Sequence, residues 1–203
     1  MVNFLPAFYG VCGRGFVIGN DGLPLYKFLL SPWKTRVRLA IQLLDLIDHL
    51  INSSSEWELI ILKFDFNSFY VTSNGQLVLK NIDDLVIIDK TQTNADEYEP
   101  PVSACNDKCL SEIFELKSLC KEPTFRPYSH VMFLIACTNI LSDENDRKEE
   151  QDKNIEGMGL LHDPVGQQSH YVSEFLTRCI HEESFGARIA TVKKFRHILK
   201  QML

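Results

Sequence analysis

The sequence lacks any hydrophobic run long enough to cross a membrane, any internal repeat and any excess of basic residues. A membrane-spanning helix needs about 18 consecutive apolar residues, and the longest runs here, such as Val131–Ala136, are of the size of core segments. Residues 1–10 have neither the basic start nor the apolar centre of a secretory signal. The net charge of −6 gives the chain little attraction for phosphate backbones. These absences predict no transmembrane segment and no nucleic-acid partner.

Cysteine is too sparse for a small disulfide-dense scaffold, with 6 residues among 203. The even number is compatible with three bridges, and it is equally compatible with buried free thiols in a cytosolic protein. A zinc site could begin with Cys105 and Cys109, but no Cys/His pair follows at the spacing of a zinc finger. Counting alone therefore leaves bridges and free thiols open.

What is present is typical of a globular domain. The chain is 45% hydrophobic and 24% charged, which places it far from the composition of disordered chains. Ser31 and Pro32 are a typical helix start, and apolar residues then recur at spacings of three and four as far as Asn52. Asn74-Gly75 predicts a tight hairpin turn between two short strands.

The remaining pattern predicts strands first and helices afterwards. Two strands are expected around Gly13-Arg14-Gly15, a short helix over residues 22–30, and further strands over 59–62, 69–71, 76–80 and 85–88. Residues 91–108 and the charged segment 142–157 are typical of loops, and 159–164 of a compact turn. Helices are expected over 108–119, 129–141, 169–180 and 185–203. The fold class is α+β and mostly helical.

This order of elements is that of the large lobe of a protein kinase, in which a long helix leads into a catalytic loop, a hairpin and a metal-binding aspartate. The chain resembles the divergent protein kinase domain family in its deleted-in-autism-1 branch. The resemblance lies in FLPAFYGVCGR (4–14), SPWKTRVRLAIQLLDL (31–46), FNSFYVTSNGQLVLKNIDDLVIIDK (66–90), CNDKCLSEIFELKSLC (105–120) and GLLHDP (159–164).

The resemblance implies a protein-kinase-like fold of one domain. Residues 1–20 would supply residual strands and the hinge, and residues 21–203 the helical large lobe, with a catalytic-loop-like hairpin over 59–90. In that family a small lobe and an N-terminal signal or anchor precede this region. Both are missing here, so the chain is expected to begin partway through a larger fold.

Three positions that carry phosphoryl-transfer chemistry in kinases are degenerate under this resemblance. Lys63 stands at the position of the catalytic Asp, Ser68 at that of the magnesium-binding Asn, and Asn81 at that of the second magnesium-binding Asp. Magnesium prefers hard, charged oxygen ligands, and a lysine with an ordinary pKa accepts no proton at neutral pH. The resemblance therefore implies a pseudokinase with no cofactor.

In an alternative interpretation, nearby carboxylates take over the catalytic and metal-binding roles. Asp65 lies two residues after Lys63, and Asp83 and Asp84 follow Asn81. Under this interpretation the chain is an atypical kinase that uses ATP with magnesium or manganese; otherwise the three acids are solvated loop residues. A further alternative is a truncated, non-functional product of a longer gene. Its missing lobe would leave an exposed apolar rim, expected to comprise Phe4, Leu5, Phe8, Phe16 and Val17.

Other motifs favour structural roles. Gly13-Arg14-Gly15 lacks the continuation of a phosphate-binding loop and predicts a tight turn. His162 beside Asp163 could act as a general base, but a stabilised turn before Pro164 is the favoured interpretation. The basic terminal helix could dock on an acidic partner or a membrane surface; a helix that covers the core is favoured.

The resemblance also implies compartment and mode of action. Related domains are lumenal or secreted, which favours disulfides among Cys12, Cys105, Cys109, Cys120, Cys137 and Cys179. Asn52 begins a glycosylation sequon that matters only in the secretory route. The first hypothesis is therefore a pseudokinase of the Golgi or endoplasmic reticulum lumen, or a secreted one, that binds protein partners or acts as a signal.

Overall fold

The fold comes from a computed structural model that describes residues 4–13, 15–19, 22–52, 56–61, 64–80, 82, 85–89, 131–143, 157–166, 169–182 and 185–203. The strands are β1 (Phe8–Cys12), β2 (Gly15–Ile18), β3 (Leu23–Pro24), β4 (Trp57–Ile61), β5 (Phe69–Val71), β6 (Leu77–Leu79) and β7 (Leu85–Asp89). The helices are the 3-10 helix η1 (Leu25–Phe28), α1 (Trp33–Asn52), α4 (Val131–Ala136), its π-helical continuation η4 (Cys137–Leu141), α5 (Ser169–His181) and α6 (Phe185–Gln201).

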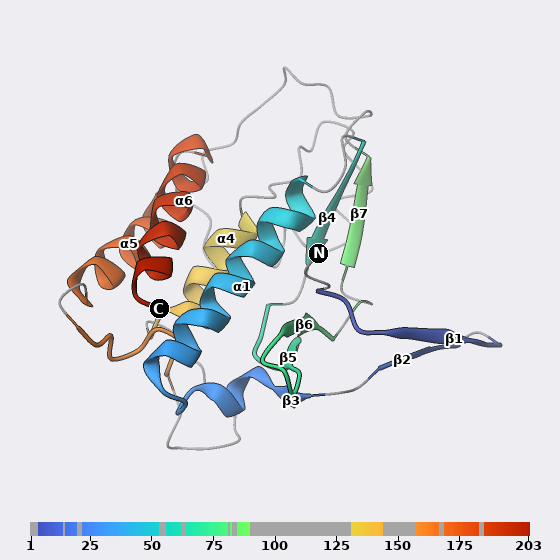
Figure 1. The fold of residues 1–203 in the computed structure, drawn as a ribbon. Helices are drawn as coiled ribbons and strands as arrows, with labels where there is room; N and C mark the ends of the chain where they lie inside the picture. Colours follow the sequence, from blue (N-terminus) through green and yellow to red (C-terminus); the bar gives the residue numbers. More distant parts are fainter. Residues whose placement is uncertain are drawn as a thin grey trace.

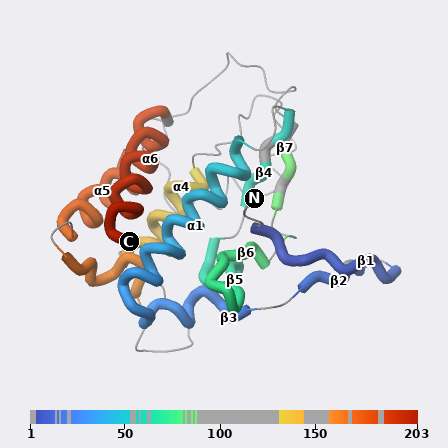
Figure 2. Tube along the Cα trace, in the orientation of Figure 1, coloured from blue at the N-terminus to red at the C-terminus, as the bar shows by residue number. Residues whose placement is uncertain are grey.

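Helix α1 is the centre of the molecule. Its predicted start is confirmed, because the helix begins at Trp33, directly after Pro32. Helices α5 and α6 lie on one side of α1 and the strands lie on the other, as Figures 1 and 2 show. Because α1 has neighbours on several sides, apolar residues around most of its circumference are buried, including Val37, Leu43 and Ile47.

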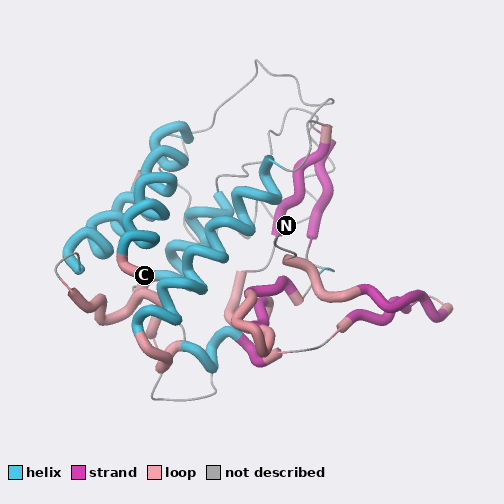
Figure 3. The backbone as a smooth tube through the Cα atoms, in the orientation of Figure 1, coloured by secondary structure: helices cyan, strands magenta, loops and turns pink. Residues whose placement is uncertain are grey.

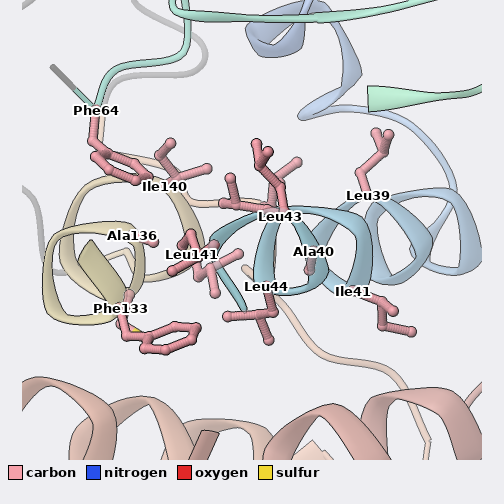
Figure 4. Close-up of a cluster of buried hydrophobic side chains, with 14 of the residues drawn as sticks. Leu39, Ala40, Ile41, Leu43, Leu44, Phe64, Phe133, Ala136, Ile140 and Leu141 are labelled. Atoms are coloured by element: carbon pink, nitrogen blue, oxygen red, sulfur yellow. The ribbon is translucent and has the colours of Figure 1, made fainter. Parts of the chain in front are cut away.

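The core forms where α1 meets α4 and η4. Figure 4 shows Leu43 and Leu44 of α1 beside Ile140 and Leu141 of η4, and all four side chains are fully buried. Phe133 of α4 enters the same cluster on the side toward α5 and α6. Full burial of one such side chain contributes about 1.5–3 kcal/mol relative to exposure, so this helix contact is a main source of stability.

The strands that the structure describes form three small antiparallel sheets rather than one (Figure 3). Strand β4 pairs with β7, with Leu59 opposite Ile87. Strands β3, β5 and β6 form a three-stranded sheet, with Phe69 opposite Leu79. The predicted turn between β5 and β6 is confirmed, and Gly75 there takes a φ of 78° that suits glycine.

Strands β1 and β2 form a hairpin that projects from the body of the protein (Figure 1). Phe8 is 65% exposed and Val11 is 72% exposed, and Leu5 and Val17 are also exposed. Of the residues expected to form an apolar rim, Leu5, Phe8 and Val17 are exposed. The prediction for Phe4 is wrong, because its backbone oxygen accepts a hydrogen bond from Leu79 and its side chain is buried. The side chain of Phe16 lies outside the described residues.

We expect the backbone amides of β1 and β2 to exchange with solvent at least about tenfold faster than those of β5 and β6. A two-stranded hairpin is marginal in water without a packed face, whereas β5 and β6 bury Phe69 and Leu77. Hydrogen-exchange mass spectrometry of the two hairpins measures the difference. Equal protection would show that something in the protein covers β1 and β2.

Several predictions differ from the structure in their bounds. Residues 22–30 were expected to form one helix, which is wrong, because Leu23 and Pro24 pair with β5 and only Leu25–Phe28 is helical. A strand-forming partner here overrides local helix preference. Helices over 169–180 and 185–203 are confirmed within about two residues, and the described part of 129–141 is α4 with η4.

Some predicted segments lie outside the described residues, namely the loop over 91–108, the helix over 108–119 and most of the charged segment 142–157. The division of the chain at residue 20 likewise stays a prediction. None of the described helices combines the length and the apolar character needed to span a membrane.

Candidate functional site

The segment that resembles a catalytic loop folds back on itself through Asp65. Its carboxylate Oδ1 accepts a hydrogen bond of 2.7 Å from the backbone N–H of Ser68 and one of 2.9 Å from the Ser68 hydroxyl. An aspartate that bonds the backbone a few residues further along is a common way to close a turn. Ser68 is fully buried in this arrangement. The side chains of Asp65 and Ser68, the two candidate oxygen ligands of this loop that the structure describes, are therefore bonded to each other.

The hairpin brings Lys80 beside Ser68, one of the predicted metal positions. The backbone N–H of Lys80 donates to the backbone oxygen of Ser68 over 2.8 Å. Asn81, the other predicted metal position, follows Lys80 directly in the sequence. The side chains of Lys63, Asn81, Asp83 and Asp84 lie outside the described residues, so their roles stay predictions.

Helix α1 and η4 hold the hairpin and the loop in place. The Gln42 side chain donates to the backbone oxygen of Gly75 over 3.0 Å and accepts from the N–H of Leu77 over 2.8 Å. Asn139 Nδ2 donates to the backbone oxygen of Phe64 over 3.3 Å. These contacts join segments far apart in sequence, so the position of the loop depends on the helical core.

A lysine and a tyrosine are in contact on the outer face of the sheet that contains β5 and β6. Lys80 Nζ donates to Tyr70 Oη over 2.6 Å and lies 4.2 Å from the centre of the Tyr70 ring. Tyr70 and Lys80 are both half-buried. This pair is not among the residues predicted from the sequence, although the alternation of β5 and the turn at Asn74-Gly75 place both residues on the same face.

The described residues supply few oxygen ligands for a divalent cation near the loop. No group of three or more His, Cys, Asp or Glu residues gathers among the described residues. Magnesium sites in nucleotide-binding proteins usually supply one or two carboxylates beside the phosphates. Of the residues considered for this role only Ser68 and Asp65 are described, and the Ser68 hydroxyl donates to the Asp65 carboxylate.

The GLLHDP turn, residues 159–164, is built around a buried arginine. Arg36 of α1 is 5% exposed, and its Nη1 lies 3.0 Å from the backbone oxygen of Leu160, 2.7 Å from that of His162 and 2.8 Å from His162 Nδ1. Its Nε donates to the oxygen of Ser31 over 3.1 Å, and the guanidinium lies 5.2 Å from the Trp33 ring. The arginine thus joins the start of α1 to the turn.

Burial lowers the pKa of Arg36, and the carboxylates of Asp163 and Asp143 oppose this shift. The His162 ring is also buried, and its Nδ1 lies 2.7 Å from the oxygen of Gly159 as well as beside Arg36. These contacts support the structural interpretation of the turn over a general base. Arg36 is not among the residues predicted from the sequence. The signal that could have identified it is a cation on the helix face of Ala40 and Leu43, four and seven residues before them.

Backbone contacts seat the same turn against the end of η4. The N–H of Leu160 donates to the oxygen of Ile140 over 2.7 Å. A Cβ atom on Gly159 would lie 2.3 Å from the oxygen of Ser142, so only glycine fits there. Asp163 takes a φ of 43°, a left-handed conformation that aspartate tolerates better than most residues. The compact turn predicted over 159–164 is confirmed.

One of the implied disulfides is present. Cys137 of η4 and Cys179 of α5 are bridged, and both are fully buried. Cys12 is an exposed free thiol, so the bridge implied for it is wrong in this structure; it lies on the projecting hairpin, and no described cysteine other than the bridged pair is available to it. Cys105, Cys109 and Cys120 lie outside the described residues.

The remaining sequence candidates fall on the surface or in the core. Asn52 is exposed at the end of α1, and its Nδ2 donates to Asp48, so the sequon asparagine is accessible in the fold. In the terminal helix the apolar residues Val192, Phe195 and Leu199 are buried. The interpretation of α6 as a helix that covers the core is confirmed.

The glycine pair near the start of the chain forms a turn. Strands β1 and β2 pair as far as Cys12 and Gly15, and Gly13 between them takes a φ of 59°, in the left-handed region that glycine adopts readily. The tight turn predicted from Gly13-Arg14-Gly15 is confirmed.

The central helix, the loop after it and the antiparallel hairpin define a kinase-like domain. In sequence comparison, residues 2–181 match the family described as the protein-kinase domain of FAM69, and the chain belongs to that family. The resemblance stated from its motifs is thereby confirmed, and the α+β architecture agrees with a kinase-like fold.

Curated relatives carry the name divergent protein kinase domain. The chain is 27% identical over 206 residues to divergent protein kinase domain 2A of Xenopus tropicalis and of Homo sapiens, covering 96% of this chain and 45% of each relative. It is 28% identical over 116 residues to divergent protein kinase domain 2B of Bos taurus, covering 53% of this chain and 27% of the relative. The chain thus spans about half the length of the 2A relatives.

Proposed function

We propose that the chain is a pseudokinase domain of the secretory pathway that acts through protein binding or signalling, without phosphoryl transfer. The observation that carries the proposal is the bond between the Ser68 hydroxyl and the Asp65 carboxylate. Ser68 is the one described side chain at a predicted metal position, and Asp65 is the one described carboxylate that could replace a lost metal ligand. The hydrogen bond joins these two side chains to each other. A buried serine hydroxyl is also a weaker magnesium ligand than a carboxylate.

The residue identities at the other two positions support the same interpretation. Lys63 would have to lose a proton before it could accept one from a substrate hydroxyl. Asn81 lacks the negative charge that draws a divalent cation to the phosphates. Loss of both charges removes the base and the main electrostatic contribution of kinase catalysis.

Two features support the compartment and the mode of action. The Cys137–Cys179 bridge suits an oxidising compartment, because structural disulfides are rare in cytosolic proteins. The exposed apolar side chains of β1 and β2, among them Phe8, Tyr9 and Val11, suit a surface that binds another protein.

The test is a phosphoryl-transfer assay on the intact protein with labelled ATP and either magnesium or manganese. We expect incorporation into the protein itself and into generic acceptor proteins to equal that of a heat-denatured sample. Asp65→Asn is the informative variant, and Asp48→Asn on the surface of α1 is its matched control. Metal-dependent transfer that Asp65→Asn abolishes and Asp48→Asn preserves, at unchanged melting temperatures, would overturn the proposal in favour of an atypical kinase.

A further inference from the structure

The outer face of β5 and β6 carries a cationic side chain that no described carboxylate neutralises. Tyr70 and Val78 are opposite one another in the ladder, and Lys80 follows two residues after Val78 on the same face. The other face holds Phe69, Val71, Leu77 and Leu79, all of which are buried. Within the described residues, Tyr70 Oη is the only hydrogen-bond partner of Lys80 Nζ.

The pair keeps hydrogen-bond donors beyond the bond that its two side chains share. Tyr70 Oη accepts the bond from Lys80 Nζ, so the phenol keeps its own hydrogen for another partner. The ammonium has two further N–H groups, and its position over the ring holds it in place. A positive charge with three remaining donors is complementary to an oxyanion.

Lys80 lies beside one of the predicted metal positions and next in sequence to another. Lys80 donates its backbone N–H to Ser68 and immediately precedes Asn81. We propose that Lys80 and Tyr70 bind a phosphate-bearing anion without a divalent cation, the ammonium supplying the countercharge that a metal would otherwise supply. This inference rests on the proposed function, in that it takes the metal positions as lost.

A second lysine–tyrosine contact in the same chain provides a matched control. Lys27 Nζ lies 4.9 Å from the centre of the Tyr26 ring on η1, and Lys27 is exposed. This contact is longer than the 4.2 Å of Lys80 over Tyr70, and Lys27 is the more exposed lysine. Lys27 therefore serves as the control, an ordinary surface lysine over an aromatic ring, against which Lys80 is compared.

The experiment is calorimetric titration of the intact protein with inorganic pyrophosphate in the presence of EDTA, with inorganic phosphate and ATP as further arms. We expect saturable binding that weakens as salt is added. Lys80→Met should weaken pyrophosphate binding by at least about tenfold, Tyr70→Phe by a smaller factor and Lys27→Met not at all. Lys80→Arg should retain most of the affinity, because it keeps the charge. The order of affinity among the three anions identifies whether one phosphate or a polyphosphate is preferred.

The inference would be overturned by no binding at millimolar pyrophosphate, by equal binding in Lys80→Met, or by an equal loss in Lys27→Met. If Lys80→Met fails to fold, chemical-shift changes of the Lys80 and Tyr70 side chains in the unaltered protein decide the question. Binding that appears only with magnesium or manganese would contradict both this inference and the proposed loss of metal chemistry. Absence of any anion binding would contradict this inference alone.

Discussion

Arg36→Met should lower the free energy of unfolding by about 3 kcal/mol or more. The substitution leaves the backbone oxygens of Leu160 and His162 buried without the donor that now serves both. Each unsatisfied buried acceptor costs about 1–3 kcal/mol. Arg36→Lys should recover only part of the loss, because a single ammonium does not reproduce the guanidinium contacts to both the turn and Ser31. Chemical denaturation monitored by circular dichroism measures both variants.

Arg196→Met is the matched control for this prediction. Arg196 also bridges two segments, with Nη1 at 2.7 Å from Asp45 and 3.3 Å from Asp48, but its partners are carboxylates with access to water. Ion pairs at such positions contribute about 1 kcal/mol or less. Equal losses for the two arginines would show that the Arg36 contacts contribute nothing beyond a surface ion pair.

Removing the Cys137–Cys179 bridge should lower the free energy of unfolding by about 3–4 kcal/mol. The two cysteines are 42 residues apart, and a bridge across a loop of this length removes much conformational freedom from the unfolded chain. The double variant Cys137→Ala/Cys179→Ala, compared with the oxidised protein by chemical denaturation, measures the effect. Both sulfurs are buried, so in the native protein they should also react slowly with a reducing agent.

Cys12→Ala is the control for the bridge, because Cys12 is an exposed free thiol. It should leave the unfolding curve within about 0.5 kcal/mol of the original while removing the readily alkylated thiol of the hairpin. A double variant as stable as the parent protein would contradict the prediction, and so would rapid reduction of the bridge under native conditions.

Local patterns were sufficient for the elements whose causes lie within a few residues. Pro32 starts α1 and the apolar spacing of three and four continues to its end, because both depend on the helix itself. Asn74-Gly75 specifies the hairpin turn through backbone conformations that glycine adopts at little cost. The same holds for α5 and α6, whose apolar faces repeat with helical period.

The prediction over residues 22–30 failed because its cause lies elsewhere in the chain. Leu23 and Pro24 are extended because Val71 and Tyr70 pair with them, and nothing within the segment reports that partner. For the candidate site, the sequence identified Ser68 and Asp65 individually. Their mutual hydrogen bond depends on the turn that the loop adopts.

The sequence by itself determined the family, the central helix and the hairpin. These follow from spacing and side-chain identity, which are properties of short segments. Only the tertiary structure decided that Arg36 is the buried centre of the GLLHDP turn and that Cys137 pairs with Cys179 while Cys12 stays free. It also decided that Lys80 meets Tyr70. Such contacts join residues 10 to 126 positions apart, and their partners are chosen by how the elements pack, which no local pattern records.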